Sequence, residues 1–122
     1  MVPAGRVTEQ AAITTDWTAT ILAATGTAPD PAYPLDGEDL MPVCTGKRDV
    51  YDRTLFWRTR EYDAARVGNW KYLKEGGDEH LFNLSTDPGE KVDLRTKDPD
   101  RFEQIKKQYL AWNARMLPKP RD

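Results

Sequence analysis

The sequence has few of the residue types that build disulfide frameworks and metal sites. Its 122 residues contain one cysteine, Cys44, and one histidine, His80. A single cysteine excludes an internal disulfide framework and any zinc site with several cysteine ligands. A lone histidine likewise excludes a histidine-rich metal site. No apolar run is long enough to cross a bilayer, so the sequence predicts no membrane span.

An excess of charge of one sign is also lacking. The net charge is −2 and acidic and basic residues are interleaved, so the chain has no basic surface of the kind that binds nucleic acid. The N-terminal "MVPAGRVTEQ" lacks the apolar centre of a signal peptide. The chain has the length of a single domain, and four Trp, five Tyr and three Phe supply the apolar surface for a small core.

The first half contains one clear helix signal, "TTDWTATILAATG", which predicts a helix over residues 15–25. Three residues could cap its N-terminus: Thr14, Thr15 or Asp16. Gly26 suits the left-handed position at its C-terminus. The apolar residues share one face, namely Trp17, Ile21 and Ala24, with Leu22 beside them. We expect this face to dock on a surface that the chain does not contain.

The segment from residue 27 to 46 contains four prolines and two glycines and has no sustained hydrophobic period. These residues break helices and strands. The composition predicts a long surface connection that joins two architectural units.

The pattern after this connection changes to that of β-strands. "TLFWRT" (residues 54–59) alternates and is rich in aromatic residues. "AARV" and "WKYLKE" flank Gly68-Asn69, which could form a hairpin turn or a bulge in one longer strand. Gly76-Gly77-Asp78 precedes "EHLFNL" and is a stronger turn signal. These segments predict a small antiparallel sheet of three or four strands.

The last element is the strongest prediction, a C-terminal helix that begins with Asp98 as N-cap and Pro99 at the first helical position. One apolar stripe then follows at helical spacing: Phe102, Ile105, Tyr109, Trp112 and Met116. Pro118 is expected to stop the helix. The stripe should cover one face of the sheet and bury Leu55, Trp57 and Leu81. The fold class predicted is α+β.

Three short motifs suggest chemistry but have simpler interpretations. "TGKR" lacks the glycine spacing of a phosphate loop and is interpreted as a turn. A calcium loop around Gly37 would need a twelve-residue ligand pattern, and that pattern does not follow its neighbouring acids, Asp36, Glu38 and Asp39. His80 could act as a general base, but no nucleophile is evident beside it, so a surface or sheet-edge histidine is favoured.

Two arginines are the candidate substrate-binding residues. If the strand alternation continues, Arg58 and Arg60 lie on the same face of the sheet. Two guanidinium groups on one face could hold an anionic substrate group. They could equally form ion pairs with nearby acidic residues, and this second interpretation is favoured.

Taken in order, four segments resemble the C-terminal end of sulfatases, within the alkaline-phosphatase-like superfamily. They are "DWTATILAATG", "LDGEDLMPVCTGK", "LFWRTREYDAARVGNWKYLKE" and "HLFNLSTDPGEKVDL". The positions that match the family pattern are Asp36, Gly37, Leu40, Pro42, Gly46, Trp70, Lys71, Leu81, Phe82, Asn83, Leu84, Asp87, Pro88, Glu90 and Leu94. Each piece alone is weak, but the ordered set is specific and covers nearly the whole chain.

The resemblance implies a domain division. Residues 1–45 would be the tail end of the sulfatase N-terminal α/β domain, with the lead-in, helix 15–25 and the connecting loop. Residues 46–122 would be the C-terminal subdomain. "LFNLSTDPGEKVDL" would be its final strand and the turn into the last helix, with Glu90 able to accept backbone N–H bonds.

The resemblance also implies where the chemistry lies. Sulfatases hydrolyse sulfate esters with a formylglycine nucleophile and a divalent cation, usually calcium, and both are expected only in the N-terminal domain. The formylglycine arises from the cysteine of a C-x-P-x-R motif, but Gly46 stands here in place of that proline after Cys44. The resemblance therefore assigns no catalytic and no metal-binding residue to this chain, and no cofactor.

Two functions follow as expectations. The first is the C-terminal part of an arylsulfatase-like sulfuric ester hydrolase, inactive alone, in whose intact parent Arg58 or Arg60 touches the distal part of the substrate. The second is a stand-alone interaction module that keeps the sulfatase C-terminal subdomain and binds a partner chain. The expected partners are the sulfatase N-terminal domain or a second copy of the chain bound through helix 15–25.

Overall fold

The computed structural model describes residues 2–119, which form two compact units. The first unit extends to Asp52 and the second begins at Arg53. The assignment of residues 1–45 to the end of a larger catalytic domain stays a prediction.

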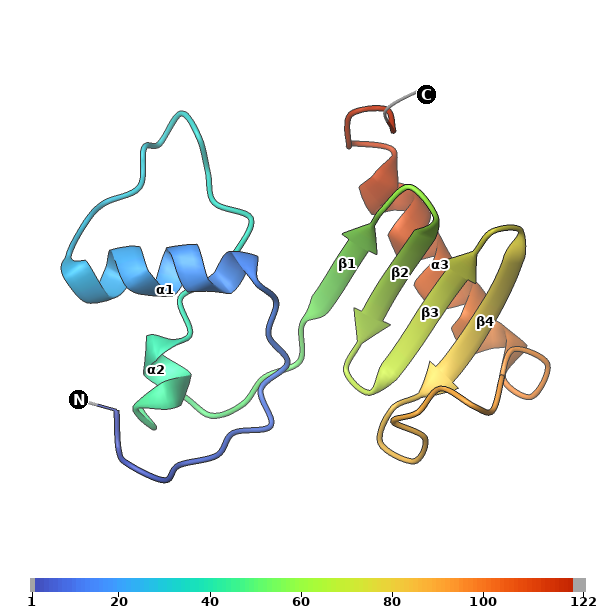
Figure 1. Cartoon of the computed structure of the whole chain (residues 1–122), viewed down its shortest axis with the longest axis horizontal. Helices are drawn as coiled ribbons and strands as arrows, with labels where there is room; N and C mark the ends of the chain where they lie inside the picture. The colour runs from blue at the N-terminus through green and yellow to red at the C-terminus, as the bar shows by residue number, and fades with distance from the viewer. Residues whose placement is uncertain (1, 120–122) are drawn as a thin grey trace. The chain divides into compact units, whose positions relative to one another are not determined.

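The first unit contains α1 (Thr15–Thr25), within the residue range predicted from the sequence (Figure 1). Gly26 follows in the left-handed conformation with φ of 69°, as expected. The N–H groups of Gly26 and Thr27 donate to the carbonyls of Ala23 and Leu22, which closes the last turn. Glycine adopts positive φ without steric cost, so this position ends the helix cleanly.

The start of α1 differs from a simple side-chain cap. The N-cap residue is Thr14, and its hydroxyl makes no capping bond. The side chain of Asp16 instead accepts a hydrogen bond from the backbone N–H of Ile13, at 2.8 Å. The other carboxylate oxygen of Asp16 accepts from the N–H of Glu38, at 2.9 Å. This carboxylate therefore joins the connecting segment to the helix start.

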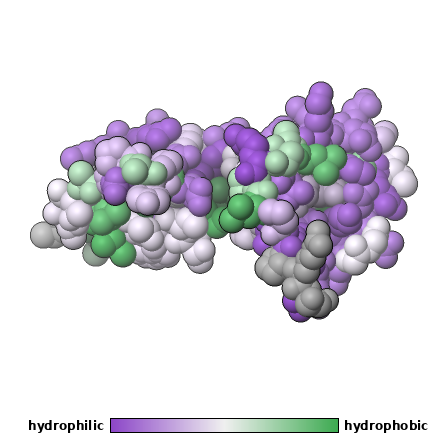
Figure 2. All heavy atoms as spheres, turned by 90° about the horizontal axis from the view of Figure 1, so that it is seen from above, coloured by the Kyte–Doolittle hydropathy of each residue, from purple (hydrophilic) through white to green (hydrophobic). Residues whose placement is uncertain are grey.

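The apolar face of α1 is uncovered, as the sequence predicts. Trp17 is 69% exposed and Ile21 is 55% exposed, whereas the buried residues of the helix are Asp16 and Ala19. In Figure 2 green and pale spheres gather on the unit that contains α1, and the sheet unit is mainly purple from this side. The helix thus buries Asp16 and Ala19 and exposes Trp17 and Ile21.

The connecting segment contains a helical turn that the sequence interpretation missed, α2 (Met41–Cys44). Pro42 sits at the start of this turn, where its missing N–H costs nothing. The buried side chain of the turn is Val43. Gly37 lies in the same segment, where an added Cβ would come within 2.2 Å of the carbonyl oxygen of Thr15. The connection is therefore packed closely against α1.

The second unit contains four antiparallel strands in sequence order, β1 (Thr54–Arg58), β2 (Tyr62–Val67), β3 (Trp70–Glu75) and β4 (Asp78–Asn83). Gly68-Asn69 forms a hairpin turn between β2 and β3, which resolves the choice between turn and bulge. Gly76-Gly77 joins β3 to β4. Both turns place a glycine with positive φ first, Gly68 at 56° and Gly76 at 59°. This geometry matches the twist of the flanking strands.

One face of the sheet is covered by α3 (Pro99–Asn113), which runs behind the strands in Figure 1. Asp98 caps it as predicted, with its side chain accepting from the N–H of Arg101 at 3.2 Å. The buried core consists of Ala65, Tyr72, Leu81, Phe102, Ile105 and Tyr109. Trp112 packs at the edge of this core and stacks on Phe56, with ring centroids 5.0 Å apart. The fold is α+β, as predicted.

The prediction for the covered face is right for Leu81 and wrong for Trp57, whereas Leu55 is buried as predicted, at 4% exposure, but on the face away from α3. Phe56 stacks on α3, and successive side chains of a strand point to opposite faces. Leu55 and Trp57 therefore point away from α3. The run "LFW" is apolar at every position, so its pattern could not say which residues face the helix.

The end of α3 also differs from its prediction. The helix ends at Asn113, five residues before Pro118, so the proline is not what stops it. Met116 lies beyond the helix and is 37% exposed. The apolar stripe that contacts the sheet therefore runs only from Phe102 to Trp112.

Candidate functional site

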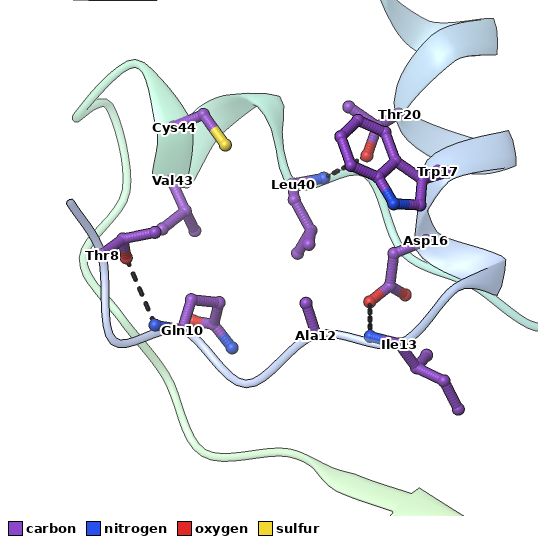
Figure 3. Close-up of a pocket in the computed structure, with 10 residues that line it drawn as sticks. All are labelled: Thr8, Gln10, Ala12, Ile13, Asp16, Trp17, Thr20, Leu40, Val43 and Cys44. Atoms are coloured by element: carbon purple, nitrogen blue, oxygen red, sulfur yellow. Dashed lines mark hydrogen bonds between the residues drawn. The ribbon is translucent and has the colours of Figure 1, made fainter. Parts of the chain in front are cut away.

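The best-defined concave site lies in the first unit, where the lead-in, α1 and the α2 segment enclose a pocket of about 210 Å³ (Figure 3). Its walls are mainly apolar. The lining residues are Thr8, Gln10, Ala12, Ile13, Asp16, Trp17, Thr20, Leu40, Val43 and Cys44. Binding sites for small apolar groups have this character, a concave surface with few polar atoms.

The walls of this pocket are fixed by hydrogen bonds between segments distant in sequence. Gln10 donates to the carbonyl of Tyr51 at 3.1 Å and accepts from its N–H at 2.9 Å. The hydroxyl of Thr20 accepts from the N–H of Leu40 at 3.0 Å. The carboxylate of Asp16 adds its bonds to Ile13 and Glu38. Because these bonds already use polar groups at the wall, a ligand here would bind mainly through apolar contacts.

Cys44 is the last residue of α2, and its thiol lines this pocket half-buried. The segment "MPV" before it, expected to be a loop, is helical. Gly46 follows with φ of 77°, a conformation closed to the proline of the maturation motif. The surroundings of Cys44 thus do not fit a formylglycine precursor.

The two candidate arginines are not brought together on one strand. Arg58 is the last residue of β1, whereas Arg60 lies in the bend after it and is exposed. Arg58 donates to the side chain of Asn113 at 2.8 Å and also to the carbonyl of Leu117. Arg58 therefore holds the C-terminal end of α3 against the sheet. Substrate contact by either arginine stays a prediction.

A second concave surface lies on the sheet face away from α3, with a volume of about 540 Å³. It is lined by Trp57, Tyr62, Ala64, Arg66, Lys71, Leu73, Leu84 and Glu90. Lys71 donates to both carboxylate oxygens of Glu90, at 2.6 and 2.8 Å. The backbone of Glu90 is left-handed, with φ of 54°, which is rare outside glycine.

The turn of the segment "TDPGE" is stabilised differently from the expectation. The side chain of Asp87, not that of Glu90, accepts from the backbone N–H groups of Lys91 and Val92, both at 2.8 Å. Glu90 is instead engaged by Lys71 across the sheet face. The segment between β4 and α3 is thereby tied to β3.

His80 has a partner that the sequence interpretation missed. Its ring Nδ1 lies 3.1 Å from the carboxylate of Asp93, and the ring stacks on Phe82. Asp93 also accepts from the N–H groups of Leu81 and Arg95. Burial opposes the charged form of Asp93, but these hydrogen bonds outweigh it, so its pKa lies below the ordinary value. Thirteen residues separate the pair, a spacing that follows from the turn and not from a local motif.

A polar network closes the sheet unit on the α3 side. Glu79 accepts from the hydroxyl of Tyr72 and from the ammonium group of Lys106, both at 2.7 Å. Burial opposes the charged form of Glu79, but these two hydrogen bonds lower its pKa overall. Burial, followed by the bond to Glu79, raises the pKa of Tyr72. Glu79 of β4 thus links Tyr72 of β3 to Lys106 of α3.

Across residues 2–119, no three His, Cys, Asp or Glu side chains come together in a way that could hold a metal ion. Within the same range, no helix is both long and apolar enough to span a membrane.

Comparison with known proteins gives structural matches only. Neither a protein-family model nor a curated protein sequence matches the chain. The structure Ps i-CgsB matches at 24% identity with a TM-score of 0.75, over 90% of this chain and 26% of its own. The 2-O GAG sulfatase BT1596 matches at 19% identity with a TM-score of 0.56, over 86% of this chain and 27% of its own.

A third match is BT33336S-sulf, a structure connected with the metabolism of glycosaminoglycans by Bacteroides thetaiotaomicron. It matches at 17% identity with a TM-score of 0.69, over 82% of this chain and 24% of its own. The chain thus spans about a quarter of the length of the structures that it matches. At this identity the likeness is one of fold. The chain has the fold of the C-terminal portion of a sulfatase, which confirms the resemblance seen in the sequence.

Proposed function

We infer that the chain serves as the C-terminal portion of a sulfuric ester hydrolase and has no hydrolase activity alone. The observation that carries this proposal is the coverage of the structural matches. Ps i-CgsB matches 90% of this chain, but the match includes only 26% of the Ps i-CgsB chain. The larger remainder of that fold has no counterpart among these residues.

The chemistry of the described residues supports the proposal. Cleavage of a sulfate ester needs a nucleophile, a cation that offsets the charge of the sulfate, and an acid for the leaving group. Cys44 lines an apolar pocket, and His80 is paired with Asp93 in the sheet unit. No constellation of these residues supplies the three functions together. Formylglycine and calcium would then belong to the portion that this chain does not contain.

The test is an activity assay on the purified chain. We expect no hydrolysis of an aryl sulfate or of a sulfated sugar, and no rise in melting temperature on addition of calcium. A turnover that is lost in Cys44→Ala would overturn the proposal and identify Cys44 as the nucleophile. A hydrolase activity that persists in Cys44→Ala, and that copurifies with the chain through two unrelated columns, would also contradict the proposal.

A second candidate is a stand-alone interaction module that binds a partner chain through α1. It is favoured by the exposure of Trp17 and Ile21, since large apolar residues on one helix face mark a contact surface. Analytical ultracentrifugation tests this surface, because an uncovered apolar helix face favours self-association of the chain. Trp17→Asp should abolish any self-association without altering the sheet unit.

A further inference from the structure

The pocket beside α1 has the size and lining that receive one apolar side chain. Its volume is about 210 Å³. An apolar cavity of about 150 Å³ is sufficient to bind benzene, so this pocket has room for a side chain of the size of Leu, Met or Phe. Ala12, Leu40 and Val43 supply apolar walls. Complementarity of size and polarity thus favours a single apolar group.

The exposed part of α1 beside the pocket carries large apolar residues. Trp17 lines the pocket and is 69% exposed, and Ile21, one turn further along α1, is 55% exposed. The single charged residue of α1 is Asp16, which is 2% exposed and turned inward. A pocket with an aromatic residue at its rim is typical of the centre of a protein interface, where a few anchors carry most of the binding energy.

The pocket is also formed in advance of binding. Its three segments are held by the hydrogen bonds of Gln10 to Tyr51, of Thr20 to Leu40 and of Asp16 to Glu38. A preformed site pays little conformational entropy when it is filled. Most of the free energy gained by burying an apolar side chain of a partner in this pocket is therefore available for binding.

We propose that this pocket is an anchor site, which takes one aromatic or branched aliphatic side chain from the larger part of a sulfatase fold. The inference rests on the proposed function. The larger part of a sulfatase is the occupant that the comparisons favour, because the matched region is only 24% to 27% of chains such as BT33336S-sulf and BT1596. The pocket, Trp17 and Ile21 then form one docking surface on the first unit.

The test uses Cys44, the one cysteine of the chain, as an attachment point inside the pocket. Benzyl methanethiosulfonate adds a benzyl group that fills the pocket, whereas methyl methanethiosulfonate adds the same disulfide linkage with a methyl group. The binding probe is the Ps i-CgsB chain from which the segment matched here has been removed. Affinity is measured by isothermal titration for the unmodified, methylated and benzylated full-length chains.

We expect the unmodified and methylated chains to bind the probe alike, and the benzylated chain to bind about tenfold or more weakly. Equal binding of all three would overturn the anchor site while leaving the proposed function in place. Failure of the unmodified chain to bind would contradict the proposed function itself. A dimer of the chain alone that is lost on benzylation would make a second copy the occupant and refute the proposal.

A second variant guards against a benzylated chain that unfolds. Ala12→Leu fills the pocket from the exposed lead-in, without modification of the buried turn. Circular dichroism reports whether each form keeps its helices. A folded Ala12→Leu chain that binds the probe as tightly as the parent would refute the anchor site by an independent route.

Discussion

The carboxylate of Asp16 should be the most sensitive single group of the first unit. It is 2% exposed and accepts hydrogen bonds from the backbone N–H groups of Ile13 and Glu38, at 2.8 and 2.9 Å. These bonds join the lead-in and the connecting segment to the first turn of α1. Asp16→Ala removes both acceptors and leaves two backbone donors without these partners.

The expected cost follows from the number of bonds lost. A hydrogen bond to a charged group contributes about 1.5 to 3 kcal/mol, and both bonds here are only partly buried, so the low end applies. Asp16→Ala should therefore lower the free energy of unfolding by about 3 kcal/mol. Asp16→Asn keeps one oxygen acceptor and should cost about half as much, although its amide group cannot accept from the second N–H.

The assay combines urea denaturation with hydrogen exchange at the amides of Ile13 and Glu38. Both amides should exchange faster in Asp16→Ala, while those of the sheet unit stay protected. Asp30→Ala is the matched control, because Asp30 accepts from the N–H of Ala32 in an exposed turn, where the loss is small. If Asp16→Ala unfolds within 0.5 kcal/mol of the parent, roughly the scatter of surface substitutions, the reasoning is refuted.

Three further changes test the packing and the charges. Gly37→Ala should destabilise the first unit by about 1 to 3 kcal/mol because its Cβ meets helix backbone, and Gly77→Ala, with nothing within 4 Å, serves as control in a melting experiment. Trp112→Ala should lower the free energy of unfolding, measured by urea denaturation, by about 3 kcal/mol, whereas Leu110→Ala, at an exposed position, should leave it almost unchanged. Glu79 has a lowered pKa, so its charged form stabilises the fold above its ordinary pKa of 4.5, and this stabilisation is lost as the pH falls through the pKa of the folded state. In Glu79→Gln the free energy of unfolding should therefore fall less steeply at acid pH.

The sheet unit could be predicted closely because its signals are local. Strand alternation, the glycine turns and the Asp98-Pro99 helix start each act within a few residues, and the observed elements follow them. Gly68 and Gly76 ended their strands because a positive φ suits glycine at no cost. Sequence patterns predict an element well where its local preferences agree with the tertiary fold, as they do here.

The features that escaped prediction depend on tertiary contacts. Which of Leu55 and Phe56 faces α3 is set by pairing register, and both are apolar. The partnership of His80 with Asp93 requires the turn between β4 and α3 to be closed. The role of Asp16 was interpreted as a possible cap, but its carboxylate reaches Glu38, a residue distant in sequence. No pattern within α1 marks such a contact.

The strand order of the sheet has a consequence for how the second unit folds. Every strand pairs with its neighbour in sequence, in the order β1-β2-β3-β4, and α3 follows directly. Such local pairing avoids the entropy of closing long loops, and a hairpin closes within about 1 to 10 μs. We expect this unit to acquire its strands by successive hairpin closures, so that changes in the Gly68 and Gly76 turns alter its refolding rate as well as its stability.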